Sequence, residues 1–526
     1  MPDPAPASAV LQSIIGNATR YADRAALVQG GRRLSWRELD RQANRVANHL
    51  ASLGVRHGDK VCVLSPNSIA FVETFLGILK IGGCVVPLPS MVTPDSLEMM
   101  INDSGARALF LADQYRDLVG PILENLGGLI EGGRIAYDFK ASNWQDYDAA
   151  LNAAADTAPK THVSEQDLFN IIYSSGTTGV PKGITHDHGL RSFQVERLQG
   201  LGIDETAISL LSTPLYSNTT LVTLMPTLAA GGCCVLMARF DVLDYLDICQ
   251  RERVTHTMLV PVQYQRIMAH PDFERFDLSA MKLKLSTSAP LRAGLKRDIA
   301  ARFPGLMIEI YGLTEGGGST VLSVTDFPDK LESVGTPGLS VDIRIIDEDG
   351  QECPQGVAGE IVGRSGAMMT GYHKRQELTD AIRWRDDKDQ VFFRSGDIGY
   401  FDEDGFLFLS DRKKDMIISG GLNIYADDLE RVLLDHPAID DVAVIAVPSD
   451  RWGETPLGLV VLRQDAIDGT EEILAWANEK LGKSQRLKIA TKTIPTSMAG
   501  TPMIAIDQNC SVVVGMVRLN VWPSVC

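Results

Sequence analysis

The stretch YSSGTTGVPKG, Tyr173 to Gly183, is the most informative part of this chain. It combines Ser/Thr hydroxyls and glycines with a lysine, and it directly follows the apolar run LFNII. Glycines let the backbone approach a ligand closely, and consecutive backbone N–H groups and hydroxyls can hold phosphate oxygens. A plain surface loop is the alternative, but Lys182 and the preceding strand-like run favour phosphate binding. The candidate phosphate-binding residues are Ser174, Ser175, Gly176, Thr177, Thr178, Gly179 and Lys182.

This loop is not of the Walker type, because GxxxxGK[ST] does not fit it. The nearest approach to that pattern is ANEKLGKS, Ala477 to Ser484. It follows the helical pattern EEILAWANEKL instead of a strand. We therefore interpret it as the end of a helix.

Composition indicates a globular enzyme of more than one domain. The chain has 526 residues and a net charge of −17, with 50 basic and 67 acidic side chains. So acidic a chain repels nucleic acid and anionic membrane surfaces, and neither is expected as a partner. No run of 18 uncharged apolar residues occurs, so we expect no stable membrane insertion.

The cysteines predict free thiols. None of the eight has CxxC spacing, and Cys233 and Cys234 are adjacent within an apolar, strand-like run. The N-terminus lacks the basic and apolar regions of a signal peptide. We expect a reducing, cytoplasmic location and no zinc site.

Hydrophobic periodicity predicts alternating strands and helices. LSWRELDRQANRVANHLASLGV and SIAFVETFLGILKIG have helical spacing, and GDKVCVLSP and CVVPLP follow them as buried strands. AISLLSTP, CCVLMA, THTMLVP and LKLSTSAP continue the alternation. This pattern indicates α/β layers around a largely parallel sheet.

The pattern changes near residue 335, where short alternating runs with DG turns predict β-hairpins as far as about residue 411. A small α+β unit then follows, with the helix-like ADDLERVLLDHPAI and EEILAWANEKL and the strand-like DVAVIAVPS and PLGLVVLRQ. We therefore expect a large domain over residues 1–411 and a small one over residues 412–526. The charged run near Asp411–Asp415 marks the boundary between them.

Two motifs place a carboxylate next to glycines. YGLTEGGGS, Tyr311 to Ser319, offers an aromatic face in Tyr311 and an oxygen ligand for Mg²⁺ in Glu315. RSGDIGY places Asp397 on an expected turn between strands, where its carboxylate can accept hydrogen bonds from two ribose hydroxyls. Taken singly, each motif also fits a solvated turn.

Two further stretches suggest contacts to other substrates. In SGGLNIYADDLE, Gly420 and Gly421 let a thin ligand pass close to the backbone. STPLYSNTT is small and polar, and Ser217 or Asn218 is suited to cap a helix there. The stretch contains no aspartate to meet an α-ammonium group, which counts against an amino acid substrate.

Together these motifs resemble those of the acyl-adenylating superfamily, the AMP-binding enzymes, and of bacterial acyl- and aryl-CoA synthetases in particular. The resemblance spans residues 20 to about 487. It implies a large N-terminal domain of layered α/β subdomains plus a β-rich subdomain, followed by a small mobile α+β domain. It also implies an ATP- and Mg²⁺-dependent ligase that forms an acyl-adenylate and then a coenzyme A thioester of a fatty, aryl or arylalkanoic acid.

The resemblance implies roles for individual residues. It makes Lys182, Thr314 and Glu315 catalytic, with Glu315 as the Mg²⁺ ligand, and Lys414 the hinge. Besides the phosphate loop, the ATP or AMP contacts are Ser288, Ala289 and Pro290 of the glycine-poor turn STSAPL, and Tyr311, Gly312, Thr314, Asp397 and Arg412. The acyl pocket comprises Tyr216, Ser217, Asn218, Thr219, Gly316 and Gly317, where the glycines leave room. Coenzyme A contacts Gly420, Gly421 and Leu422.

The chain departs from the family pattern near its end. IPTSMAGTPMIA keeps Pro495 and Gly500, but Thr501 stands where the family has the lysine that drives adenylation. Either the lid has diverged and Lys488 or Lys492 substitutes, or the reading frame changes after Leu487; the abrupt loss of the family pattern favours the second. Losing such a charge-stabilising donor costs on the order of 10²–10³ in rate. Both explanations predict weak adenylation.

Two alternatives to a coenzyme A ligase remain open. One is a stand-alone adenylating enzyme that loads a carrier protein, although no carrier domain is appended. The other is an adenylation-impaired protein that binds a nucleotide or acyl-AMP, as Thr501 suggests. The sequence leaves the oligomeric state open, a homodimer included.

Overall fold

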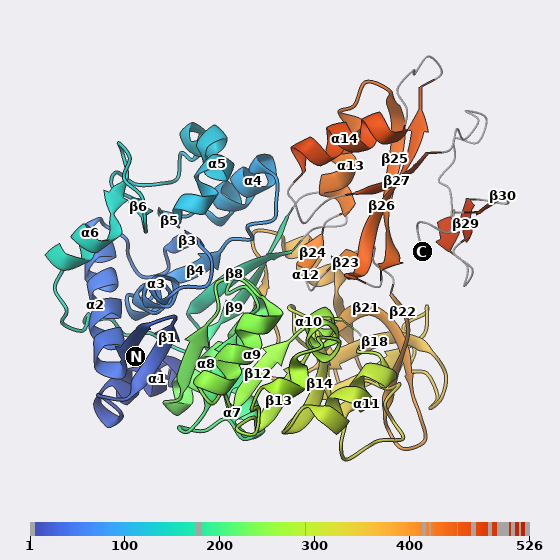
Figure 1. The fold of residues 1–526 in the computed structure, drawn as a ribbon, viewed down its shortest axis with the longest axis horizontal. Helices are drawn as coiled ribbons and strands as arrows, with labels where there is room; N and C mark the ends of the chain where they lie inside the picture. Colours follow the sequence, from blue (N-terminus) through green and yellow to red (C-terminus); the bar gives the residue numbers. More distant parts are fainter. Residues whose placement is uncertain are drawn as a thin grey trace. The chain divides into compact units, whose positions relative to one another are not determined.

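The computed structural model describes residues 6–174, 181–289, 291–412, 417–419, 422–424, 426–449, 451–463, 470–481, 487–491, 504–506, 511–514 and 517–520 (Figure 1). The chain forms a larger compact unit, which comprises residues 1–90, 94–174 and 181–413, and a smaller one, which consists mainly of residues 414–526. Both units mix helices and strands. This confirms the expected fold class, a large N-terminal α/β domain followed by a small C-terminal domain.

The larger unit contains a nine-stranded sheet with a parallel centre. The six central strands pair in parallel with one another. Antiparallel strands lie at both edges, two at one edge and one at the other. In spatial order they are β16 (Thr336–Pro337), β15 (Ser319–Ser323), β14 (Leu306–Gly312), β13 (Leu283–Ser286), β12 (His256–Leu259), β10 (Ile208–Leu211), β11 (Cys233–Leu236), β1 (Ala25–Gln29) and β2 (Arg32–Ser35).

A second, eight-stranded sheet is also largely parallel, in keeping with the expected layered α/β subdomains. β9 pairs antiparallel with both of its neighbours, β8 and β19, and the remaining pairs are parallel. The strands are, in spatial order, β19 (Gly371–Tyr372), β9 (Lys182–Asp187), β8 (Leu168–Ser174), β4 (Cys84–Pro87), β3 (Lys60–Leu64), β5 (Ala108–Leu111), β6 (Arg134–Ala136) and β7 (Gln145–Asp146).

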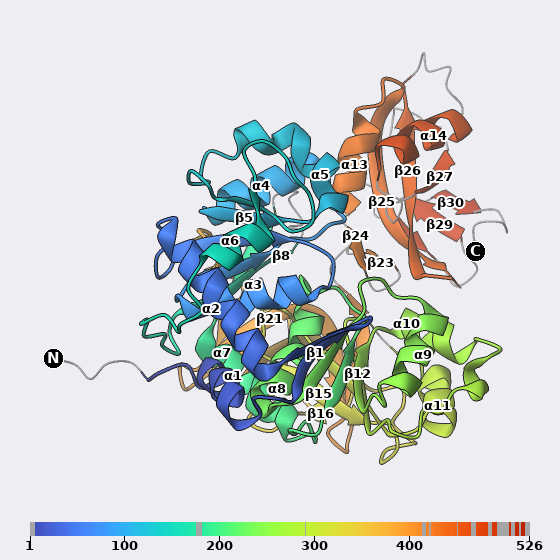
Figure 2. The ribbon, with the colours of Figure 1, turned by 60° about the vertical axis from the view of Figure 1, so that its left-hand side comes forward.

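Helices pack on these sheets and join them. One apolar core contains residues from both sheets and from α1, α2, α3 and α8, and α2 packs beside α3 (Figure 2). A second core joins the nine-stranded sheet to α9, α10 and α11. The helices of this unit are α1 (Ala9–Arg20), α2 (Trp36–Ser52), α3 (Ile69–Lys80), α4 (Pro94–Ser104), α5 (Arg116–Val119), α6 (Tyr147–Ala153), α7 (His188–Gln199), α8 (Asn218–Ala230), α9 (Val242–Arg251), α10 (Pro261–Met268), α11 (Ala293–Arg302) and α12 (Gln376–Ala381).

Helix α3 is buried almost all round, as expected for a helix enclosed by protein. Its two charged residues, which interrupt the apolar run, are satisfied inside the core. Glu73 accepts a hydrogen bond from the Tyr147 hydroxyl at 2.8 Å. Lys80 donates to Asn44 Oδ1 at 2.7 Å and pairs with Asp40. Among the described residues, none of the helices combines the length and apolar content that crossing a membrane requires.

A five-stranded antiparallel sheet forms the β-rich part of the larger unit. It comprises β17 (Asp342–Ile346), β18 (Gly359–Arg364), β21 (Val391–Phe401) and β20 (Arg383–Arg385) in spatial order, with β22 (Leu407–Arg412) paired to β21. Two hairpins, β17–β18 and β21–β22, occupy the stretches where alternating runs with DG turns predicted them.

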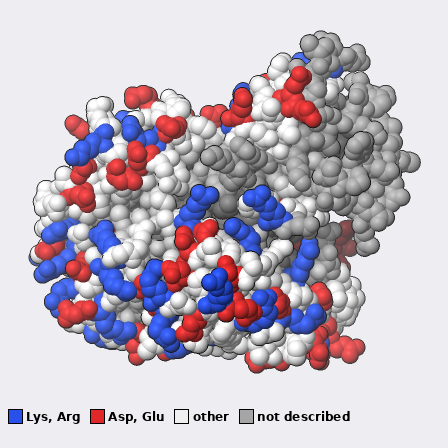
Figure 3. Space-filling model, viewed as in Figure 1, with Lys and Arg blue, Asp and Glu red and all other residues white. Residues whose placement is uncertain are grey.

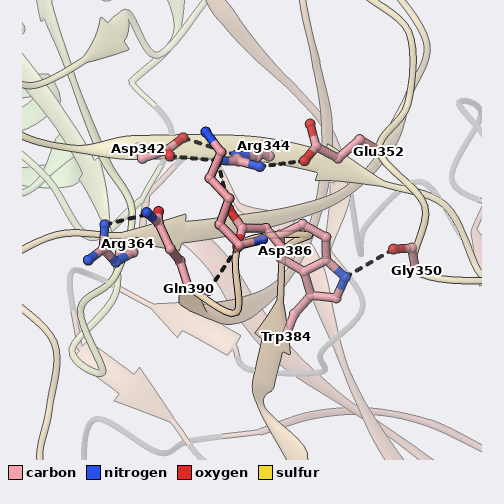
Figure 4. Close-up of polar contacts among 9 residues, drawn as sticks. Asp342, Arg344, Gly350, Glu352, Arg364, Trp384, Asp386 and Gln390 are labelled. Carbon is pink, nitrogen blue, oxygen red and sulfur yellow. Dashed lines mark hydrogen bonds and ion pairs between the residues drawn. The ribbon is translucent and has the colours of Figure 1, made fainter.

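One arginine ties the parts of this sheet together (Figure 4). Arg344 on β17 lies 3.1 Å from Asp342 Oδ2 and 3.2 Å from Asp386 Oδ2, and it pairs with Glu352. Its guanidinium also lies 4.7 Å from the Phe392 ring centroid on β21. The arginine therefore joins β17 to the β20–β21 turn, and β21 is the strand that carries Asp397.

The smaller unit has its own apolar core and a five-stranded mixed sheet. Its elements are β23 (Ile417–Ser419), β24 (Leu422–Ile424), α13 (Ala426–Leu434), β25 (Ile439–Ser449), β26 (Gly453–Leu462), α14 (Thr470–Lys480) and β27 (Lys488–Thr491). Ala477 to Lys480 lie in α14, so the Walker-like string begins inside a helix and not after a strand, as expected.

The tail also contains strands. β28 (Ile504–Ile506), β29 (Ser511–Val514) and β30 (Val517–Asn520) pair as an antiparallel sheet of their own.

The six cysteines in the described ranges are free thiols, with Cys234 buried and Cys233 half-buried in β11. On the visible face of the larger unit, Lys and Arg side chains are interspersed with Asp and Glu (Figure 3).

Arg344→Met should destabilise the larger unit by on the order of 1–3 kcal/mol, because it removes several charge-assisted hydrogen bonds at once. Thermal unfolding measures the effect. The matched control is Arg383→Met on β20, which removes a single 2.6 Å pair with Asp380 within one turn. Such exposed pairs contribute about 0–1 kcal/mol, so equal losses in the two variants would contradict the central role of Arg344.

Candidate active site

The glycine-rich loop connects the two strands of a β-hairpin, β8 and β9. β8 ends at Ser174 and β9 begins at Lys182, and these two residues are register partners across the antiparallel pair. The intervening Ser175, Gly176, Thr177, Thr178 and Gly179 lie outside the described residues. The hairpin therefore presents both ends of the loop at the same edge of the eight-stranded sheet.

Lys182 and Glu315 meet at one tyrosine. The Lys182 ammonium lies 5.7 Å from the ring centroid of Tyr372, and the Tyr372 hydroxyl donates to Glu315 Oε1 at 2.8 Å. Burial, together with the Glu315 charge, raises the pKa of Tyr372, so the phenol stays protonated and remains a donor. A cation and an oriented carboxylate thus share a half-buried site.

The turn that carries Glu315 is fixed by close backbone contacts. Met369 N–H donates to the Glu315 carbonyl at 2.9 Å, and Gly317 N–H donates to the Ala367 carbonyl at 3.0 Å. Gly316 has φ +78°, and a Cβ built there would lie 1.6 Å from the Ala367 oxygen. Backbone therefore fills the room that we expected these glycines to leave, and their place in an acyl pocket stays a prediction.

Tyr311 and Asp397 form a second pair. The Tyr311 hydroxyl donates to Asp397 Oδ2 at 2.7 Å, and the carboxylate is 5% exposed. Asp397 lies within β21 opposite Arg412 of β22, and not on a turn as the sequence suggested. The error arose because RSGDIGY contains a glycine at positive φ, Gly396, inside a strand with irregular pairing. A β-bulge at a functional site produces such a pattern.

The start of α8 contacts the turn after β13. Ser217 caps the helix by accepting from Thr219 N–H at 3.3 Å, as one of the sequence interpretations held. Thr219 Oγ1 lies 2.6 Å from Ser288 Oγ. Ser288 has φ +76°, a conformation that costs a residue with a side chain on the order of 1 kcal/mol or more. The hydroxyl pair holds these two predicted site segments together.

Sequence reasoning missed three residues that connect the site. Tyr372 joins Lys182 to Glu315, and His186 donates to the Thr314 carbonyl at 2.7 Å. Arg191 donates both to His186 and to Asn218. Buried polar residues in a strand, as in the β9 segment KGITHD, were the available signal.

For the other predicted site residues, the structure gives a position along the chain, or they lie outside the described residues. Tyr216 precedes α8, Ala289 follows β13, Gly312 ends β14, and Leu422 begins β24 of the smaller unit. Pro290, Lys414, Gly420, Gly421, Pro495, Gly500 and Thr501 lie outside the described residues. Their roles stay predictions.

Gly316→Ala should destabilise the larger unit by about 2–5 kcal/mol, because positive φ and a backbone clash act together. Gly356→Ala is the matched control, since Gly356 has φ +81° with nothing within 4 Å of its Cβ position. It should cost only about 1–2 kcal/mol. Chemical denaturation compares the two variants, and a Gly316→Ala cost no larger than that of the control would refute the clash.

The chain is similar to known proteins along most of its length. Residues 16–373 match the AMP-binding enzyme family, and residues 428–497 match the AMP-binding enzyme C-terminal domain. A feruloyl-CoA synthase from Amycolatopsis sp is 35% identical over 486 residues, covering 90% of this chain and 93% of that protein. The long-chain-fatty-acid–CoA ligase FadD13 of Mycobacterium tuberculosis is 29% identical over 472 residues, covering 89% and 91%.

A solved structure is similar over nearly the whole chain. The amide bond synthetase McbA from Marinactinospora thermotolerans has a TM-score of 0.83 at 25% identity, covering 93% of this chain and 97% of that one. Residues 498–526, which include Thr501, lie beyond both family matches. The family match covers most of the larger unit, and the feruloyl-CoA synthase is 35% identical over 90% of this chain. The chain therefore belongs to the AMP-binding enzyme family and is a ligase.

Proposed function

We propose that the chain is an AMP-forming acid–thiol ligase that converts a carboxylic acid to its coenzyme A thioester. The observation that carries the proposal is the convergence of Lys182 and Glu315 on Tyr372, at the loop end of the β8–β9 hairpin. A cation there suits phosphate, and positioning with charge neutralisation is most of what phosphoryl chemistry requires. The 35% identity to a feruloyl-CoA synthase supports the same reaction.

The nucleotide would be held on several sides. Asp397, oriented by Tyr311, is suited to accept hydrogen bonds from vicinal ribose hydroxyls. Glu315 supplies a carboxylate, and Mg²⁺ is a metal that takes one or two protein carboxylates and completes its shell with phosphate oxygens and water. Bound there, Mg²⁺ would neutralise phosphate charge.

Two displacements make up the proposed reaction. A carboxylate oxygen of the acid attacks the α-phosphorus of ATP, and pyrophosphate leaves to give the acyl-adenylate. The thiol of coenzyme A, losing its proton, then attacks the acyl carbonyl, and AMP leaves. The acid is a fatty, aryl or arylalkanoic acid, as feruloyl-CoA synthase and FadD13 are named for an aryl and a fatty acid.

Pyrophosphate release with ATP and Mg²⁺ tests the proposal, using ferulate, indoleacetate and a long-chain fatty acid, each with and without coenzyme A. We expect release that depends on one acid class, with coenzyme A consumed and AMP formed. Glu315→Gln should lower this rate at least tenfold and raise the Mg²⁺ concentration needed, because it removes the anionic ligand.

The acceptor is the second readout. Adenylation that yields product only with an amine or a phosphopantetheinylated carrier protein would overturn the coenzyme A acceptor while keeping the ligase. ATP binding without pyrophosphate release under any acid would overturn the ligase proposal in favour of a binding protein.

Thr501→Lys should raise acyl-adenylate formation by on the order of 10²–10³, because it restores a charge-stabilising donor at the family position. Thioester formation from synthetic acyl-AMP should change little. Thr501→Met, similar in length but uncharged, is the control and should not raise the rate. If the native chain already adenylates at the rate of the lysine variant, the predicted defect does not exist.

A further inference from the structure

A buried polar network lies beside the candidate site, and the proposed chemistry uses none of its central members. Arg191, His186 and Asn170 are each 1% exposed or less. They lie on α7, β9 and β8, between the first residue of α8 and the turn after β14. Burying so many polar groups is costly unless each is hydrogen-bonded, so their partners decide what the network does.

Arg191 uses all five of its N–H donors. Its Nε donates to Asn170 Oδ1 at 3.2 Å, and one terminal nitrogen donates to the same oxygen at 2.7 Å and to His186 Nδ1 at 2.8 Å. The other terminal nitrogen donates to Gln194 Oε1 and to Asn218 Oδ1, both at 2.8 Å. Within the part of the chain that the structure describes, no carboxylate forms an ion pair with Arg191.

These contacts determine the state of His186. Because Nδ1 faces the Arg191 donor, that nitrogen is the acceptor, and Nε2 carries the proton. Nε2 then donates to the Thr314 carbonyl at 2.7 Å. Burial, and next the charge of Arg191, lower the pKa of His186 far below its usual range, so the ring is neutral. The histidine is thus a fixed, directional donor to one backbone carbonyl.

The Thr314 carbonyl is one of three anchors of the Thr314–Glu315 segment. The Glu315 carbonyl accepts from Met369 N–H, and the Glu315 carboxylate accepts from Tyr372. His186 therefore holds the Thr314 carbonyl, whereas the other two anchors hold Glu315. Displacing a catalytic group by about 1 Å can cost on the order of 10²-fold in rate.

We propose that Arg191 and His186 are positioning residues for adenylation, which hold the Thr314–Glu315 turn in register with Asn218 at the start of α8. The inference rests on the proposed function, in which this turn serves the nucleotide and the start of α8 faces the acid. Through one guanidinium, the two sides of the site share a common anchor. A change at either end is transmitted to the other through Arg191.

Paired substitutions at His186 test the inference. In His186→Asn the shorter amide can still accept from Arg191, but it cannot reach Thr314. In His186→Gln the longer side chain carries an N–H to about the Nε2 position. We expect His186→Asn to lower kcat for pyrophosphate release about 10–100-fold, with the KM for the acid within about threefold of the wild type, and His186→Gln to recover most of the loss.

The matched control is His256→Asn. His256 is also buried, and its Nε2 faces the Gly202 carbonyl at 3.2 Å, but it lies at the amino end of β12. This variant should lose stability and keep the wild-type kcat per folded molecule. Thermal unfolding and ATP affinity by calorimetry are measured for every variant, so that folding and nucleotide binding are scored apart from turnover.

The outcomes separate the two proposals. A folded His186→Asn variant with the wild-type kcat would overturn the positioning role. Equal losses of kcat in the Asn and Gln variants, matched by equal losses of stability, would also overturn it. A wild-type protein that releases no pyrophosphate with any acid would refute the proposed function instead. In that case the ATP affinity of His186→Asn still tests the network, because a displaced Thr314–Glu315 turn should weaken binding severalfold, and an unchanged affinity would overturn it.

Discussion

One side chain, in addition to the shared apolar core, links the two largely parallel sheets of the larger unit. Asn67, which follows β3 of the eight-stranded sheet, donates to the Thr213 carbonyl at 2.7 Å and accepts from Leu215 N–H at 2.8 Å. It also donates to the carbonyls of Leu211 and Met237, which end or follow strands of the nine-stranded sheet. The carboxyl ends of parallel strands from both sheets are thereby held at one place. Ligands bind at such edges in α/β proteins.

The buried guanidinium of Arg191 is stabilised near the candidate site by hydrogen bonds to neutral groups. A buried guanidinium without a carboxylate partner is expensive unless its donors are all used, and Arg191 meets that condition with neutral oxygens and one imidazole nitrogen. Its hydrogen-bond acceptors are all neutral, so these contacts do not cancel the positive charge, although the Asp187 carboxylate interacts with it electrostatically. Close to where anionic phosphates and a carboxylate would bind, such a charge stabilises anions, and it does so from a group that cannot move toward them.

The elements of the larger unit could largely be predicted, because local patterns determine them. Strand runs such as LFNII and CVVPLP, and the glycine-rich loop between strands, reflect periodicity and turn chemistry over a few residues. The Asp397 turn was wrong for the same reason: a local glycine signal was taken as a chain reversal, whereas pairing with Arg412 keeps the strand intact.

Contacts between distant segments could not be predicted in this way. Tyr372 meets Glu315 across 57 positions, and His186 meets Thr314 across 128. Polar residues inside a strand, as in KGITHD, are a local signal that such side chains have partners, but the partners themselves are determined by the packing of β19 and β9. The order of the strands within each sheet could not be predicted either, because strand order is a property of the whole unit.

The residue at position 501 is expected to affect the rate of adenylation more than the binding of substrates. The groups proposed to hold ATP and the acid lie largely within or near the family match over residues 16–373. Thr501 lies beyond residue 497, where the second match ends. A missing cation at that position removes stabilisation of charge that develops as the adenylate forms, and such stabilisation acts on the transition state more than on the bound ground state. Substrate binding and adenylation rate are therefore expected to be affected independently.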